Sequence, residues 1–204
     1  MMRKLFNKYR CDKGFKHGYE AVYEPDFEPL KNEPINILEI GIFKGQSTKA
    51  WLDYFPNATI YGIDIFTRVN PDDVDALQHE RVKYLKGNSM QPSVAKKMES
   101  EWPDVQFDII IDDGKHTPEA NRLSFENTNK FLKPDGAYYI EDVFPIDKMT
   151  MKEMSIPWIQ NRQNDYNMFE FLKFERALDG WTIQRYDLRK KSGEPDSYIV
   201  KVTR

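Results

Sequence analysis

Short apolar runs alternate with stretches of helical character between residues 35 and 143, and this alternation constrains the fold more than any other feature. The runs cover residues 35–40, 58–63, 82–85, 107–111 and 137–140, and the stretches between them cover 46–54, 71–79, 92–101 and 118–131. Such alternation is typical of βαβ units that form a parallel sheet. The runs are apolar at successive positions, as expected for strands that helices cover on both faces.

The last sixty residues depart from this alternation. Residues 144–164 show no clean period and are expected to form an insertion at the sheet edge, and residues 164–178 are expected to form a helix. Residues 181–188 and 198–202 are β-rich and joined by a turn-rich link, which predicts an antiparallel hairpin. We therefore expect a doubly wound α/β fold, with a mostly parallel Rossmann-like sheet and a C-terminal antiparallel hairpin.

Size and charge narrow the class of protein. The chain has 204 residues, a formal net charge of −3 and a single cysteine, Cys11. One domain at 35–204 is expected, preceded by an N-terminal segment at 1–34 that acts as a lid or contacts substrate. The balanced charge disfavours nucleic acid and membrane partners, and one cysteine excludes an internal disulfide. No signal peptide or apolar span is evident, so a cytoplasmic location is expected.

A glycine turn follows the first apolar run, at the point where a doubly wound sheet binds ligands. Gly41 and Gly45 allow backbone to approach a ligand, and Ser47 lies where the next helix is expected to begin. A dinucleotide fingerprint would carry glycines in a G-x-G-x-x-G pattern, whereas this turn has Phe43 between its two glycines. The turn could also be a simple strand-to-helix connection.

Two acids point to an adenosyl ligand rather than a dinucleotide. Asp64 ends the second run about 20 residues after the turn, where an acid is expected to bind ribose hydroxyls. Glu39 beside the turn would repel a pyrophosphate and attract an ammonium group, such as that of S-adenosylmethionine. Asn88 ends the third run and is a weaker candidate for the adenine end.

Four carboxylates end two neighbouring runs. Asp112 and Asp113 end the fourth run, and Glu141 and Asp142 end the fifth, so both pairs should reach the same edge of a parallel sheet. Crowded carboxylates repel each other, and a hard divalent cation such as Mg²⁺ would offset the repulsion. The acids could instead cap helices or bind the adenosyl group. His116 follows in the next loop and is a candidate general base, although a surface histidine would fit its position equally well.

Several motifs together resemble one methyltransferase subgroup. Residues 38–47 (LEIGIFKGQS) and 61–66 (YGIDIF) look like motif I and the acidic second-strand end of class I S-adenosylmethionine-dependent methyltransferases. Residues 12–14 (DKG), 17–19 (HGY), 111–116 (IDDGKH) and 140–142 (IED) resemble signatures of macrocin and mycinamicin sugar O-methyltransferases and cephalosporin-hydroxylase-like proteins. Lys115 replaces the usual serine of that subgroup.

The resemblance implies roles for individual residues. It makes Asp113, Glu141 and Asp142 the metal ligands and leaves Asp112 nearer the cofactor. The subgroup's N-terminal motif corresponds to Asp12, Lys13, His17 and Tyr19, which we expect in a lid over cofactor and substrate, although a solvated turn would fit equally well.

The leading hypothesis is a metal-dependent O-methyltransferase that acts on a sugar hydroxyl of a small molecule or glycan, with His116 as general base. A catechol-type enzyme and a binding module that retains only the cofactor pocket are the alternatives. A homo-oligomer is also possible, because residues 1–34 show few obvious core positions.

Overall fold

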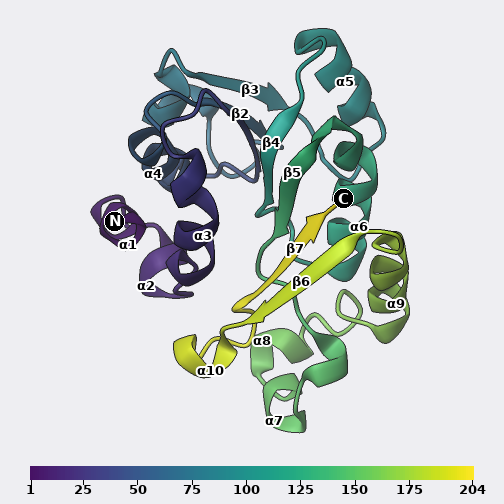
Figure 1. Ribbon diagram of the computed structural model, residues 1–204. Helices are drawn as coiled ribbons and strands as arrows, with labels where there is room; N and C mark the ends of the chain where they lie inside the picture. Colours follow the sequence, from purple (N-terminus) through teal and green to yellow (C-terminus); the bar gives the residue numbers. More distant parts are fainter.

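The computed structural model describes residues 1–204 and contains one seven-stranded sheet in the order β3-β2-β1-β4-β5-β7-β6 (Figure 1). Its strands are β1 (Asn36–Ile40), β2 (Thr59–Asp64), β3 (Val82–Lys86), β4 (Phe107–Asp112), β5 (Leu132–Ile140), β6 (Thr182–Asp187) and β7 (Tyr198–Thr203). Strands β1 to β5 are parallel, and β7 pairs antiparallel with both β5 and β6. The expected α/β sheet with its C-terminal hairpin is confirmed.

Helices cover both faces of the sheet because its strands are apolar on both sides. One face packs against α1 (Met2–Lys8), α3 (Glu20–Phe27) and α4 (Gln46–Tyr54). The other packs against α5 (Ser93–Glu101), α6 (Pro118–Thr128) and α9 (Met168–Ala177). Successive residues of β1 go to opposite sides, with Ile37 in the first core and Leu38 in the second.

Two expected elements differ in detail. Residues 71–79 form two 3-10 helices, η2 (Pro71–Asp73) and η3 (Asp75–Gln78), instead of one α-helix. Val74 between them is extended, and the side chain of Asn70 caps the first by accepting a hydrogen bond from the N–H of Asp72. Strand β5 begins earlier than expected, at Leu132, and its pairing with β4 skips from Leu132 to Ala137, so residues 133–136 bulge from the ladder.

The N-terminal segment contributes more to the core than its sequence indicates. Met2, Phe6, Tyr23 and Phe27 are each at most 1% exposed and belong to the first core, where Tyr23 packs edge-on against Trp51. The expectation of few core positions was therefore wrong. These side chains lie on short helices without a long apolar period, so the pattern did not identify them. Helix α2 (Asp12–Phe15) joins the two core-packing helices and faces the site described below.

Residues 144–164 form a small subcluster at the β7 side of the sheet. They include α7 (Met151–Met154) and α8 (Pro157–Gln160), and Phe144 and Ile159 pack with Tyr166, just beyond the segment, into a separate three-residue core. A last short helix, α10 (Arg189–Ser192), lies in the link between β6 and β7. None of the helices combines the length and the apolar character needed to cross a membrane.

Candidate functional site

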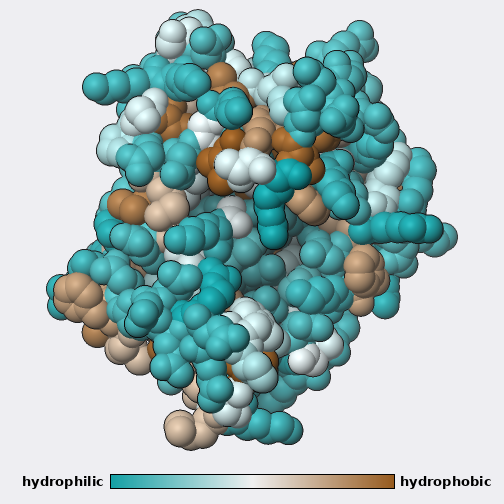
Figure 2. All heavy atoms as spheres, turned by 180° about the vertical axis from the view of Figure 1, so that it is seen from behind, coloured by the Kyte–Doolittle hydropathy of each residue, from teal (hydrophilic) through white to brown (hydrophobic).

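A cavity of about 840 Å³ lies at the carboxyl ends of β1, β2 and β4. Figure 2 shows the molecule from behind, with a hollow near the middle of this face. Its size is within the range of roughly 300–1,000 Å³ that is usual for small-molecule sites. The cavity joins the two groups of residues identified in the sequence: Gly41, Ser47, Asp64 and Asn88 line it, and so do Asp113, His116 and Asp142.

The glycine turn after β1 packs tightly against the end of β4. Gly41 has φ +90°, and a Cβ atom there would lie 2.1 Å from the backbone oxygen of Asp113. A side chain at this position would therefore force the two turns apart. Gly41 thus allows the turn after β1 and the turn after β4 to lie in close contact.

Asp64 holds the same turn from the end of β2. Its Oδ2 accepts hydrogen bonds from the backbone N–H groups of Ile42 and Phe43, both at 2.9 Å, and its Oδ1 accepts one from Phe66 at 2.7 Å. An ionised carboxylate offers about four acceptor positions. About one remains for a ligand hydroxyl, so Asp64 can shape the turn and still contact a ribose.

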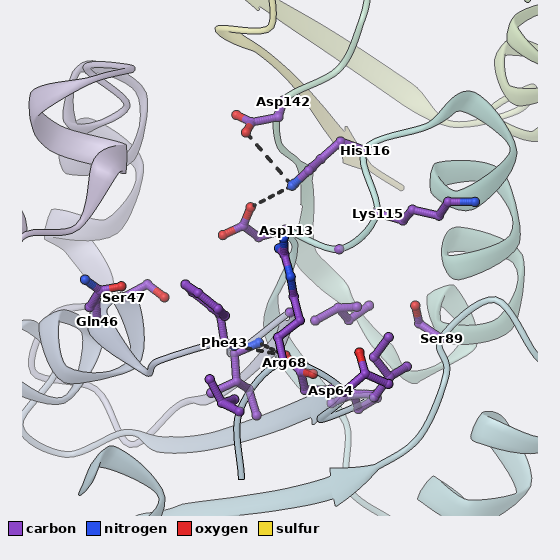
Figure 3. A pocket seen from close by; sticks show the side chains of 18 of the residues that line it. Phe43, Gln46, Ser47, Asp64, Arg68, Ser89, Asp113, Lys115, His116 and Asp142 are labelled. Carbon is purple, nitrogen blue, oxygen red and sulfur yellow. Dashed lines mark hydrogen bonds and ion pairs between the residues drawn. The ribbon is translucent and has the colours of Figure 1, made fainter. Parts of the chain in front are cut away.

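Phe43 extends from this turn into the cavity. It is 42% exposed and has φ +48°, a left-handed conformation that costs a bulky residue free energy. The guanidinium of Arg68 lies 5.8 Å from its ring centroid, and Figure 3 shows Arg68 extending from the loop after β2 toward Asp113. The turn keeps a backbone shape suited to glycine although Phe43 occupies the position.

Asp113, His116 and Asp142 converge at the other end of the cavity (Figure 3). His116 Nε2 lies 3.5 Å from Asp113 Oδ1 and 4.0 Å from Asp142 Oδ2. One donor atom from each residue can be chosen so that all lie within 4.8 Å of one another. Two carboxylates and an imidazole suit a divalent cation, and Mg²⁺ is commonly held through one or two carboxylates with water completing its shell. The residues present therefore fit a metal ion.

Glu141 lies outside this group, with its side chain turned into the protein. It is 1% exposed, and both Lys13 Nζ and the hydroxyl of Tyr23 donate hydrogen bonds to its carboxylate. Lys13 Nζ also lies 2.5 Å from Asp113 Oδ2. Burial opposes the charge of Lys13, but the two carboxylates raise its pKa well above the usual value. Lys13 therefore supplies a positive charge among these acids. From the sequence, a divalent cation was the expected means of offsetting their repulsion.

Tyr19 and His17, two further residues of the N-terminal motif, do not line the cavity either. The hydroxyl of Tyr19 donates a hydrogen bond to Asp142 Oδ1, and Tyr19 is fully buried. His17 Nδ1 lies 2.8 Å from the hydroxyl of Ser197 and 3.7 Å from Asp142 Oδ1. Burial raises the pKa of Asp142, and the nearby His116 opposes that shift. Tyr19 and His17 therefore support Asp142, while their predicted contact with a cofactor stays a prediction.

Three more predicted cofactor residues do not line the cavity. Glu39 is buried and accepts hydrogen bonds from Thr48 and Trp51 of α4. Gly45 precedes α4 as its N-cap, with φ +70°. Asp112 is buried, and desolvation raises its pKa to about 7. Their predicted contacts with a cofactor stay predictions.

Sequence reasoning missed several lining residues. Arg10, Cys11 and Phe15 form a wall of the cavity together with Asp12 of the N-terminal motif, and Arg68 extends across it from the loop after β2. Phe15 lies between the motif residues Lys13 and His17, which was the only available signal for this wall.

A family model described as "Methyltransferase domain" matches residues 38–143, which include the glycine turn and both acidic strand ends. Among curated proteins, the chain is 30% identical over 151 residues to demethylmacrocin O-methyltransferase of Streptomyces fradiae. It is 28% identical over 151 residues to mycinamicin VI 2''-O-methyltransferase of Micromonospora griseorubida. Each match covers 70% of this chain and 36% of the relative, so the chain spans about a third of their length.

Solved structures agree with the fold. The MycE methyltransferase of mycinamycin biosynthesis, in complex with Mg and SAH, superposes with a TM-score of 0.70 at 24% identity. That match covers 99% of this chain and 54% of the other. The methyltransferase PaMTH1 of Podospora anserina, bound to SAH, has a TM-score of 0.64 at 15% identity, with 99% of this chain and 86% of the other covered. At these identities the likeness concerns the fold.

Proposed function

Because the chain belongs to the methyltransferase-domain family, we propose that it transfers a methyl group from S-adenosylmethionine to a sugar hydroxyl of a small molecule or glycan. The curated relatives are named as O-methyltransferases, and the name of one of them includes a rhamnosyl group, which supports the choice of a sugar acceptor. The observation that carries the proposal is the single cavity that holds both Asp64 with the glycine turn and the Asp113–His116–Asp142 group.

The cofactor is proposed to lie along the glycine turn. Asp64 would accept a ribose hydroxyl at its remaining acceptor position, and Ser47 at the start of α4 would face the methionine end. Asn88, in the loop after β3, would lie at the adenine end. The bound cofactor supplies an activated methyl group on a positively charged sulfur.

Asp113 and Asp142 are the residues proposed to hold a divalent cation. Glu141, which the family resemblance adds to this set, would have to leave its partners Lys13 and Tyr23 to join it. A cation held here would lower the pKa of an acceptor hydroxyl and fix its orientation. Lys13 stays paired with Asp113 Oδ2 and leaves the Oδ1 atom facing His116.

His116 is proposed to accept the proton of the attacking hydroxyl. A sugar hydroxyl is a poor nucleophile while it is protonated, and histidine is suited to remove a proton near neutral pH. The positive charge that develops on the imidazole is stabilised by Asp113 and Asp142, whose oxygens lie 3.5 Å and 4.0 Å from Nε2. Tyr19 in turn orients Asp142 through its hydroxyl.

The proposal is tested by incubating the protein with S-adenosylmethionine, MgCl₂ and a panel of rhamnosides, with catechol as a comparison acceptor. Mass spectrometry should detect a methylated rhamnoside, and excess EDTA should abolish its formation until Mg²⁺ is restored. Methylation of catechol but of no sugar would show that the acceptor is a catechol-type compound and contradict the sugar acceptor. EDTA-resistant methylation would contradict the metal requirement.

A further inference from the structure

One aromatic side chain of the N-terminal segment, Phe15, is largely exposed to solvent. Phe6, Tyr19, Tyr23 and Phe27 are at most 1% exposed, whereas Phe15 is 65% exposed. Phe15 has no aromatic partner among the ring pairs of the protein, and it lines the cavity that contains Asp113, His116 and Asp142. An exposed ring in a cavity is available to a ligand.

The backbone that carries Phe15 is fixed on both sides. Before it, Lys13 pairs with Glu141 and Asp113, and Gly14 packs so closely that a Cβ atom would lie 2.6 Å from Phe6 Cβ. After it, His17 contacts Ser197. The backbone that carries the ring is therefore fixed at the cavity, so a ligand that covers the ring costs little conformational entropy.

Helix α2 turns Lys13 toward its acidic partners and Phe15 into the cavity. Residues two apart on a helix point in nearly opposite directions, since each turns by about 100°. Lys13 accordingly points inward to Asp113, while Phe15 points away from that pair and toward the open cavity. Phe15 belongs to α2, whereas the residues proposed to bind the cofactor, such as Asp64 and Phe43, lie at the end of β2 and in the turn after β1.

We propose that Phe15 is the platform on which the acceptor sugar stacks, with the C–H face of a pyranose ring against the aromatic face. This inference rests on the proposed function. A phenyl ring offers a flat apolar surface and no hydrogen-bonding group, which suits the apolar face of a sugar and leaves the sugar hydroxyls free to reach His116. Phe15 is thus a positioning residue for the acceptor and does not take part in proton transfer.

The test uses Phe15→Ala, Phe15→Tyr and the matched control Phe169→Ala. Phe169 is 67% exposed on α9 and does not line the cavity, so its loss removes a similar exposed ring elsewhere. The probe is methyl α-L-rhamnopyranoside, with SAH and MgCl₂ present for binding by saturation-transfer NMR and S-adenosylmethionine for turnover. Calorimetry with SAH reports the cofactor site separately.

Phe15→Ala should raise the dissociation constant and KM of the rhamnoside at least tenfold, with kcat and SAH affinity within about threefold of wild type. Phe15→Tyr should restore binding, and Phe169→Ala should match wild type. The inference is overturned if Phe15→Ala binds the rhamnoside as tightly as Phe169→Ala does, if it weakens SAH instead, or if wild type does not bind the rhamnoside. Failure of the proposed function appears differently, as binding of SAH and rhamnoside by wild type without methyl transfer.

Discussion

Several residues that line the cavity have a left-handed backbone conformation. Six residues other than glycine have positive φ, and Arg10, Phe43, His116 and Asp142 among them line the cavity. Such conformations cost about 1–3 kcal/mol each and persist where the surrounding structure enforces them. Two of these residues, His116 and Asp142, face each other, with Nε2 4.0 Å from Oδ2.

Replacing His116 with alanine tests its role as the general base. Turnover should fall about 100- to 10,000-fold, the usual contribution of a positioned acid or base, while SAH affinity stays unchanged. His79→Ala is the control, because His79 is an exposed histidine outside the cavity. Near-normal turnover would exclude the base, and a parallel loss of Mn²⁺ affinity would instead make His116 a metal ligand.

Asp64→Asn tests the ribose contact with the least change of shape. The amide oxygen can still accept from Ile42 and Phe43, but its NH₂ group would face the N–H of Phe66. A charged hydrogen bond contributes about 1.5–3 kcal/mol, so calorimetry should show SAH affinity reduced at least tenfold. Unchanged affinity would mean that Asp64 only shapes the turn; Asp73→Asn, at an exposed position, controls for the charge.

At the scale of elements, sequence reasoning succeeded where parallel strands determine position. Asp64, Asp113 and Asp142 meet at one edge because neighbouring parallel strands end there, which the alternation of runs predicts. The pairing of Lys13 with Glu141 was not predictable in this way, since it joins residues 128 positions apart through the packing of short helices. Nothing in a local pattern indicates such a contact.

Gly41→Ala should separate the β1 and β4 turns. The added methyl group would lie 2.1 Å from Asp113 O, and overpacking of this kind costs about 1–3 kcal/mol in addition to the left-handed strain. Gly180→Ala has a similar φ of +86° with no atom within 4 Å, so it carries the strain without the clash. Urea unfolding should show Gly41→Ala clearly less stable than Gly180→Ala; equal stabilities would contradict the close approach.

Lys13→Met should reveal how far the N-terminal helices stabilise the acidic group. Removing one partner of a buried ion pair costs about 3–5 kcal/mol, because Glu141 would remain buried without its cation. Lys8→Met removes an exposed lysine paired with Asp53 and should leave the free energy of unfolding near wild type. If both variants unfold alike, Lys13 does not stabilise the buried acids.

At the scale of the whole molecule, the sheet and the N-terminal segment together make the site. Strands β1, β2 and β4 supply the floor, and α2 supplies a wall that also carries the buried cation Lys13. The sheet followed from hydrophobic periodicity, whereas the wall did not, because helices of four to eight residues leave too short a pattern to recognise. The role of residues 1–34 as a lid stays a prediction, supported by their place at the cavity.

The most direct test of the account is calorimetric titration of the protein with S-adenosylhomocysteine, with NAD titrated in parallel. The glycine turn, Asp64 and the lack of a dinucleotide fingerprint predict micromolar binding of S-adenosylhomocysteine and no binding of NAD. Binding of NAD, or of neither compound, would contradict the assignment of the cavity to S-adenosylmethionine.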